Sequence, residues 1–186
     1  MVVKIFVDTN VFSGYLILSG IEERKPDTEK KELWKKYEKI KPCYDFIKKI
    51  LLDNEKKKIV PFASGLVFSE IFNCIYDEAV CKKMIDDGVP LSSWVRLKNR
   101  FSLFIEDFEI EELDNSVYGL FHSKKFKIVA DKYDLRLISE LILKHHFMTQ
   151  DSILISTAIK EECKFFVTRD KELIKNWTKM KKRKLN

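Results

Sequence analysis

The chain has 186 residues, of which 45% are apolar, and this is enough for one domain with a hydrophobic core. A disordered chain and a fibrous repeat are therefore excluded. Lys and Arg number 35 against 29 Asp and Glu, a net charge of +6. This modest excess points to a polyanionic partner such as nucleic acid, and it is equally consistent with solubility alone.

The apolar residues are distributed in short runs. The longest uninterrupted run is four residues, at 15–18, so we expect no membrane span and no membrane partner. The N-terminal apolar stretch ends at Asp8, which is too early for a signal peptide. No cysteine pair has C-x-x-C spacing, so neither a zinc site nor a redox motif is expected. We expect a cytoplasmic protein with free thiols at Cys43, Cys74, Cys81 and Cys163.

Short apolar runs alternate with helical patterns along the chain. The run at 2–7 is rich in β-branched and aromatic residues and lacks alternation, as in a strand buried on both faces of a parallel sheet. The predicted strands are 2–7, 58–62, 108–113 and 165–167. The predicted helices are 11–18, a solvated one after Pro26 and Asp27, 42–52, 65–76, 92–104, 128–143, 151–159 and 172–177. A polar connection is expected at 114–127.

This order of elements predicts the fold class. Strands separated by helices, with no hairpin dipeptide, indicate a three-layer α/β/α fold around a mostly parallel central sheet. We expect a single domain at 1–178, with helical insertions at about 20–57 and 83–107 and a basic tail at 179–186.

Carboxylates follow two of the predicted strands. Asp8 comes directly after the first strand, and Asp170 comes shortly after the last. Ligands of open parallel sheets bind beyond the carboxyl ends of the strands, so both acids are expected to face that crevice. The alternative for each residue is that it caps the helix that follows.

Two further acids interrupt apolar helical patterns. Glu70 lies within the apolar run 66–72, where a carboxylate is costly unless it is paired or binds a metal. Its side chain can alternatively lie at the edge of the buried face and reach water. Asp151 opens the apolar segment 153–155, where capping of the helix is again the simpler interpretation.

Four acids at one edge of a sheet would suit a hard cation. Carboxylates and water are the ligands that Mg²⁺ and Mn²⁺ prefer, and no set of His and Cys residues offers softer coordination. Such a site lowers the pKa of a bound water that attacks a phosphodiester, and a second cation stabilises the departing oxygen. Without metal, mutual repulsion should raise the pKa of at least one acid.

The ordered set of motifs resembles the PIN-domain family of metal-dependent nucleases. The matching segments are 7–12 (VDTNVF), 69–71 (SEI), 150–158 (QDSILISTA) and 166–170 (FVTRD). The resemblance implies a Rossmann-like sheet and metal binding by Asp8, Glu70, Asp151 and Asp170, with Thr9, Asn10 and Thr168 as their polar supports. Glu172 is an alternative to Asp170. The family also implies cleavage of single-stranded RNA, very often by the toxin of a VapC-type toxin–antitoxin pair.

The basic residues give weaker indications. Arg169 and Lys171 flank a proposed ligand and are therefore placed to contact phosphates of RNA, whereas the run at 179–184 is more typical of a solvated tail. Beyond RNA, an antitoxin-like protein or a second copy of the chain are candidate partners. Aromatic and apolar residues of the predicted insertions could form such a surface or equally pack on the domain itself: Leu33, Trp34, Tyr37 and Trp94.

We therefore expect a Mg²⁺- or Mn²⁺-dependent endoribonuclease, acting as a toxin or in RNA processing. The alternative is a non-catalytic RNA-binding or assembly module of the same fold. A phosphatase with Asp8 as nucleophile fits less well, because the haloacid-dehalogenase pattern needs a second Asp at position 10, which is Asn10 here.

Overall fold

The computed structural model describes residues 2–24, 35, 37–55, 58–86, 88–89, 107–122 and 126–184. At its centre lies a four-stranded sheet in the order β3-β2-β1-β4, with every neighbouring pair parallel. The strands are β1 (Val3–Val7), β2 (Ile59–Ser64), β3 (Lys127–Val129) and β4 (Phe165–Val167). The predicted parallel sheet is thus confirmed.

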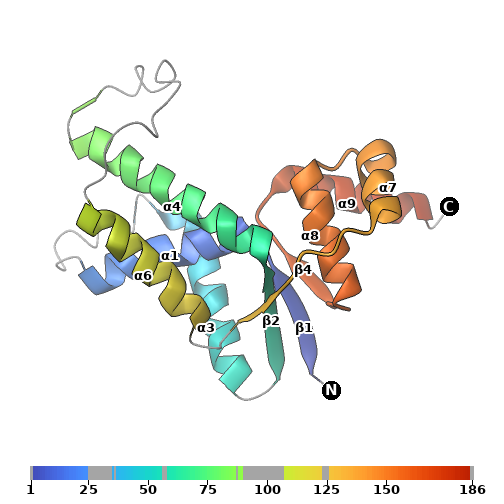
Figure 1. The fold of residues 1–186 in the computed structure, drawn as a ribbon, viewed down its shortest axis with the longest axis horizontal. Helices are drawn as coiled ribbons and strands as arrows, with labels where there is room; N and C mark the ends of the chain where they lie inside the picture. Colours follow the sequence, from blue (N-terminus) through green and yellow to red (C-terminus); the bar gives the residue numbers. More distant parts are fainter. Residues whose placement is uncertain are drawn as a thin grey trace.

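Helices cover both faces of this sheet. They are α1 (Thr9–Arg24), the 3-10 turn η1 (Glu38–Ile40), α3 (Lys41–Glu55), α4 (Gly65–Asp86), α6 (Asp107–His122), α7 (Leu135–His145), α8 (Thr149–Lys160) and α9 (Lys171–Lys184). Figure 1 shows α1, α3, α4 and α6 on one side of the strands and α7, α8 and α9 on the other. The chain returns from the edge strand β3 across the sheet to β4 through α7 and α8, which places these helices on the opposite face. This three-layer α/β/α arrangement is the predicted fold class.

The main core lies between the sheet and the first helical layer. Phe6, Val7 and Phe62 of the two central strands are essentially inaccessible to water, as expected for strands covered on both faces. Phe12 of α1 packs edge-on against Phe126, with ring centroids 4.8 Å apart. A second cluster joins the helices of the other layer: Leu141, Phe147, Ile155, Leu173 and Met180.

Two predicted elements are wrong. Residues 108–113 lie within helix α6 rather than in a strand, and Val117 and Phe121 further along that helix are buried in the core. The third strand is β3, which pairs with β2 and occupies the start of the helix expected at 128–143. The helix of that region begins only at Leu135, where the Asp134 side chain accepts a hydrogen bond from the Leu137 N–H at 3.1 Å.

Several helices extend beyond their predicted ends. Helix α1 passes through Gly20 to Arg24, and α4 continues to Asp86. Helix α9 runs to Lys184, so most of the predicted basic tail has helical backbone. The predicted helix at 92–104 and most of the helix expected after Pro26 lie outside the described residues.

Helix α3 falls within the segment 20–57 that was expected as an insertion, yet it is part of the main core. Cys43, Ile47 and Ile50 are buried in the central cluster. The packing of α3 on α1 is close, because a Cβ added at Gly14 would lie 3.2 Å from the Cβ of Cys43.

The structure describes the side chains of only some of the cysteines and of the residues expected at a partner surface. Cys43, Cys74 and Cys163 are free thiols, as predicted, and the side chain of Cys81 is outside the described part. Tyr37 donates a hydrogen bond to Glu78 of α4 and so packs on the protein itself. The other residues expected at a partner surface, Leu33, Trp34 and Trp94, lie outside the described residues. Among the described helices, none is long and apolar enough to cross a membrane.

Candidate active site

Asp8 leaves the carboxyl end of β1 and is almost completely buried, with 6% of its surface exposed. Its Oδ1 accepts a hydrogen bond from the backbone N–H of Thr9 at 2.7 Å. Its Oδ2 accepts from the Asn10 amide at 2.8 Å and from the Thr168 hydroxyl at 2.6 Å. Both oxygens therefore have donors, as a buried carboxylate requires.

The loops that follow β1 and β4 form one polar network. The Asn10 amide donates to Thr168 Oγ1 at 3.1 Å, and its carbonyl oxygen accepts from the Arg169 N–H at 2.9 Å. Thr168 Oγ1 also accepts from the backbone N–H of Asp170 at 2.9 Å. Asn10 and Thr168 thus connect the Asp8 carboxylate to the backbone that follows β4.

Glu70 reaches this network from helix α4. Its Oε2 accepts a hydrogen bond from the Thr9 hydroxyl at 2.6 Å. The amino end of α4 is fixed by Asp131, whose Oδ2 accepts from the Leu66 N–H at 2.9 Å. Asp131 follows β3 and was not singled out in the sequence, because β3 itself was not recognised there.

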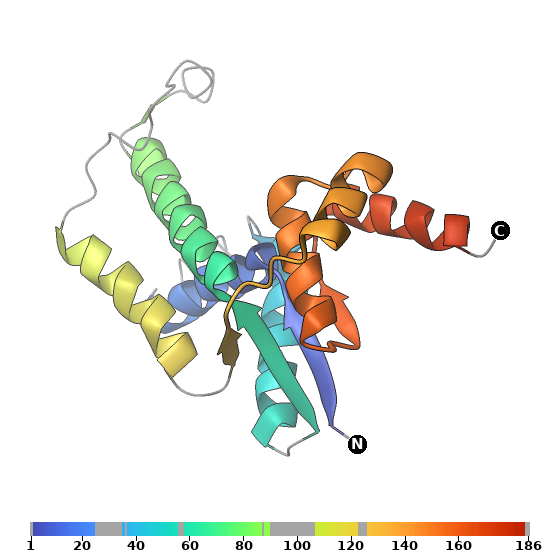
Figure 2. The same ribbon diagram turned by 45° about the vertical axis from the view of Figure 1, so that its right-hand side comes forward.

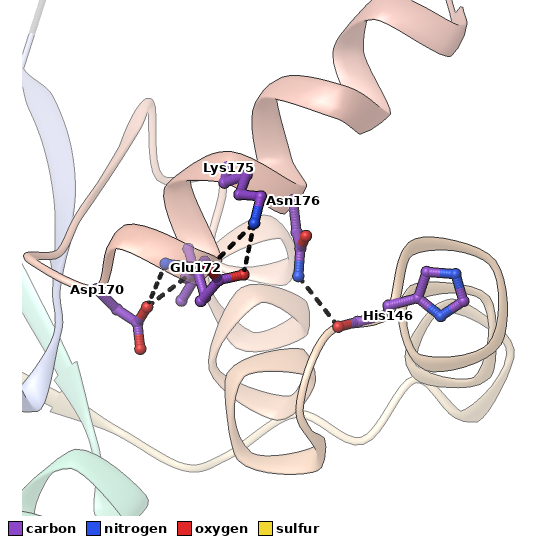
Figure 3. A network of polar contacts seen from close by, with 6 residues as sticks. His146, Asp170, Glu172, Lys175 and Asn176 are labelled. Atoms are coloured by element: carbon purple, nitrogen blue, oxygen red, sulfur yellow. Dashed lines mark hydrogen bonds and ion pairs between the residues drawn. The ribbon is translucent and has the colours of Figure 1, made fainter.

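Asp170 caps helix α9, as the simpler sequence interpretation proposed. Its Oδ1 accepts hydrogen bonds from the backbone N–H groups of Glu172 at 2.7 Å and of Leu173 at 3.0 Å (Figure 3). The residue is exposed. Glu172, the alternative acid, instead pairs with Lys175 at 3.1 Å.

Asp151 lies in the first turn of α8, and its carboxylate accepts a hydrogen bond from the Met148 N–H. This contact reaches back to the residue before the helix, as in half of a capping box. Asp151 therefore also has a helix-capping role. Capping alone does not require it to lie near other acids.

The four acids nevertheless influence one another. The pKa of Asp151 is raised to about 6, mainly by burial and then by the charges of Asp170, Asp8 and Glu70. Burial is also the main cause that raises the pKa of Asp8, with Glu70 and Asp170 adding to it. The hydrogen bonds from Thr168 and Thr9 oppose this shift. The fold therefore brings all four predicted acids into one electrostatic cluster at the carboxyl edge of the sheet.

The donor set is made of carboxylate, hydroxyl and amide groups, which fits a hard cation better than a soft one. Within the described residues, no three His, Cys, Asp or Glu side chains are arranged as a ready ligand set for one ion. Mg²⁺ usually keeps several waters and binds through one or two carboxylates. By their chemistry these residues would suit a hydrated ion held by one or two carboxylates rather than a closed protein cage.

The Arg169 side chain contacts residues of η1 and α3. Its guanidinium group donates to the Lys39 carbonyl at 3.0 Å and lies beside the Cys43 thiol, where its charge acts to lower the thiol pKa against the larger effect of burial. Arg169 thus joins the loop after β4 to η1 and α3. Lys171 is exposed at the start of α9.

Two further polar residues of α8 lie in the segment 150–158 but were given no role from the sequence. Ser156 and Thr157 are buried and hold the loop that follows β3, since the Lys132 N–H donates to Thr157 Oγ1 at 2.9 Å and Ser156 Oγ donates to the Lys132 carbonyl at 2.8 Å. Two adjacent hydroxyl residues inside an apolar helical segment could have indicated that they bind a neighbouring backbone.

Comparison with known proteins finds a related archaeal protein. No protein-family model matches the sequence. Over 91 residues, which are 49% of this chain and 73% of the other, it is 30% identical to an uncharacterized protein of Archaeoglobus fulgidus. This chain belongs to the family of that archaeal protein. Membership in this family assigns no activity, because the relative is itself uncharacterized, so the site must be interpreted from its own chemistry.

Proposed function

We propose that the protein is a PIN-like endoribonuclease that depends on Mg²⁺ or Mn²⁺. The observation that carries the proposal is the electrostatic cluster of Asp8, Glu70, Asp151 and Asp170, in which the pKa values of Asp8 and Asp151 are raised. Clustered like charges are unfavourable in the free protein, and a bound divalent cation would relieve them.

Asp8 and Glu70 are both held in place by hydrogen bonds from neighbouring polar groups. Asp8 is buried and held by Thr9, Asn10 and Thr168, so its orientation is set before any ligand arrives. Glu70 is tied to the same network through Thr9. The chemistry that a bound cation supplies in such sites is a water of lowered pKa and stabilisation of the departing oxygen of a phosphodiester.

The cellular role is a second part of the proposal. The PIN resemblance favours single-stranded or structured RNA as substrate, either for a toxin with an antitoxin-like partner or for an RNA-processing enzyme, in the cytoplasm. A homodimer is consistent with both roles.

A second candidate is a non-catalytic RNA-binding or assembly module of the same fold. It is favoured by the capping contacts of Asp170 and Asp151, which give two of the acids a structural reason to be present. The two candidates differ in turnover rather than in binding.

The decisive experiment is cleavage of labelled single-stranded RNA with Mg²⁺, with Mn²⁺ and with a chelator. We expect metal-dependent cleavage by the wild type and a loss of at least about a hundredfold for Asp8→Asn, because a ligand charge is removed while the shape is kept. Asp114→Asn in α6 is the matched control and should retain activity. Full cleavage by Asp8→Asn would refute the assignment, and binding without turnover under either metal would favour the module.

A further inference from the structure

Helix α9 has two different faces. Leu173 and Met180 are buried against the second helical layer. Lys171, Lys175 and Lys179 follow one another at intervals of four residues, are exposed, and lie on the other face. The row begins directly after Asp170 and extends for about 12 Å along the helix, away from the acids. Figure 2 shows α9 in red running outward toward the C-terminus.

A groove of about 400 Å³ lies beside this helix, between α8, the edge strand β4 and α9. Its lining includes the aromatic residues Phe165, Phe166 and Trp177. Phe165 is 50% exposed, and Lys164, the charged residue of the lining, lies with its ammonium 5.6 Å from the centre of the Phe165 ring. Thr168 also lines the groove, and it donates to Asp8, so the groove adjoins the acid cluster.

The lysine row and the groove are neighbours. Ile174 and Thr178 of α9 line the groove, and each lies three residues after a lysine of the row, Lys171 and Lys175 respectively. Residues three apart adjoin each other on a helix surface. Lys175 pairs with Glu172 at 3.1 Å (Figure 3), but an exposed pair of this kind is weak and can exchange for a phosphate contact.

From this adjacency we propose that α9 and the groove form one binding strip for single-stranded RNA. Phosphates lie along Lys171, Lys175 and Lys179, and an unstacked base enters the groove against Phe165 and Trp177. This proposal rests on the proposed function, from which it takes RNA as the ligand. The bound RNA would lie on the α9 side of the acid cluster.

The charges and rings around the groove suit RNA better than a peptide. The four acids repel a phosphate backbone, so binding must depend on cations outside the cluster. Arg169, the nearest candidate, is engaged with the Lys39 carbonyl. A basic row beside one exposed ring, Phe165, and the half-buried Trp177 is a combination that suits single strands, because every base can stack and every nucleotide carries a phosphate.

The phosphate contacts are tested by the salt dependence of binding. Full-length protein binds a labelled oligouridine in the presence of a chelator, so that cleavage does not interfere, over a range of KCl concentrations. Lys171→Ala/Lys175→Ala/Lys179→Ala should weaken binding roughly tenfold or more and reduce the slope of log affinity against log salt by about 2. The matched control, Lys48→Ala/Lys49→Ala/Lys58→Ala, removes the same charge from α3 and the opposite end of the sheet and should leave the slope unchanged. An equal effect of both triple variants would overturn the proposal.

The base contact is tested with Trp177 as a fluorescent reporter. In a Trp34→Phe/Trp94→Phe background Trp177 is the remaining tryptophan. Oligouridine should change its emission, whereas inorganic polyphosphate, which has no bases, should bind without doing so. Phe165→Ala should weaken oligouridine binding severalfold and leave polyphosphate binding intact. An unchanged emission at saturating oligouridine would overturn the placement of a base in the groove.

Failure of the strip and failure of the nuclease proposal give different results. Cleavage that persists in the α9 triple variant with unchanged KM and salt slope would overturn the strip and leave the nuclease proposal intact. Slope and emission changes as predicted, together with no turnover under any divalent metal, would support the strip and refute the nuclease.

Discussion

The hydroxyl of Thr9 donates a hydrogen bond to Glu70 at 2.6 Å and so joins two residues that are 61 positions apart. The backbone N–H of Thr9 donates to Asp8 at 2.7 Å. One residue therefore contacts two carboxylates from different segments, the end of β1 and helix α4. Thr9 thus links the positions of Asp8 and Glu70 across two segments that are distant in the sequence.

Removal of the Thr9 hydroxyl should separate Glu70 from the cluster. We expect Thr9→Val to lower stability by about 1–2 kcal/mol, because a carboxylate loses its donor in a partly buried position. Any metal-dependent cleavage should be reduced even at temperatures where Thr9→Val is still fully folded. Thr9→Ser keeps the hydroxyl and should behave like the wild type in both denaturant unfolding and cleavage. Equal behaviour of the Val and Ser variants would show that the contact has no role.

Asp151 should destabilise the metal-free protein at neutral pH. Its pKa is raised from 3.8 to about 6 in the folded state, so between these values the folded chain binds more protons than the unfolded chain. Its contribution to stability is therefore favourable below about pH 4 and is lost as pH rises through about 6.

Asp151→Asn removes this ionisation and keeps an oxygen for the Met148 N–H. We expect it to be more stable than the wild type above pH 6 by about 1 kcal/mol, after allowance for screening of a half-exposed group by water. The difference should vanish near pH 4 in thermal unfolding with a chelator. A variant less stable than the wild type at pH 8 would contradict the expected repulsion.

Asp170 allows its capping role to be separated from its charge. Asp170→Ala removes the acceptor of the Glu172 and Leu173 N–H groups and should cost about 1 kcal/mol. Asp170→Ser restores an N-cap acceptor without the carboxylate, so it should recover most of the stability. Both variants should lose metal-dependent cleavage if Asp170 serves the cluster. Full activity of the Ser variant would limit Asp170 to capping.

A divalent cation should stabilise the folded protein. On the proposed function the ion would bind the folded cluster and not the unfolded chain, so Mn²⁺ should raise the Tm by a few degrees at concentrations well above its Kd, and a chelator should reverse this. The rise should be larger at pH 8 than at pH 5, since Asp151 with a pKa of about 6 is then ionised. Asp8→Asn/Asp151→Asn should abolish it. An equal rise in this double variant would place the ion elsewhere.

Parts of the fold could be predicted because their apolar patterns are local. The strand Phe165–Val167 is a short apolar run that forms at the predicted residues and pairs with β1. A strand was wrongly predicted at 108–113 because Phe108 and Ile110 alternate with acids over a short stretch, as they would in a strand. The helical period becomes visible only when Val117 and Phe121 are included, and these positions pack in the core.

The sequence by itself determined that Asp8 and Asp170 follow strands and that Glu70 and Asp151 lie in apolar helical segments. Those are statements about neighbours along the chain, and apolar periodicity is enough to make them. Only the tertiary structure decided that all four acids interact, that Asp151 has a raised pKa, and that Arg169 contacts the Lys39 carbonyl. Burial and charge interactions depend on distances between β1, α4, α8 and β4, and these are set by how the helical layers pack on the sheet.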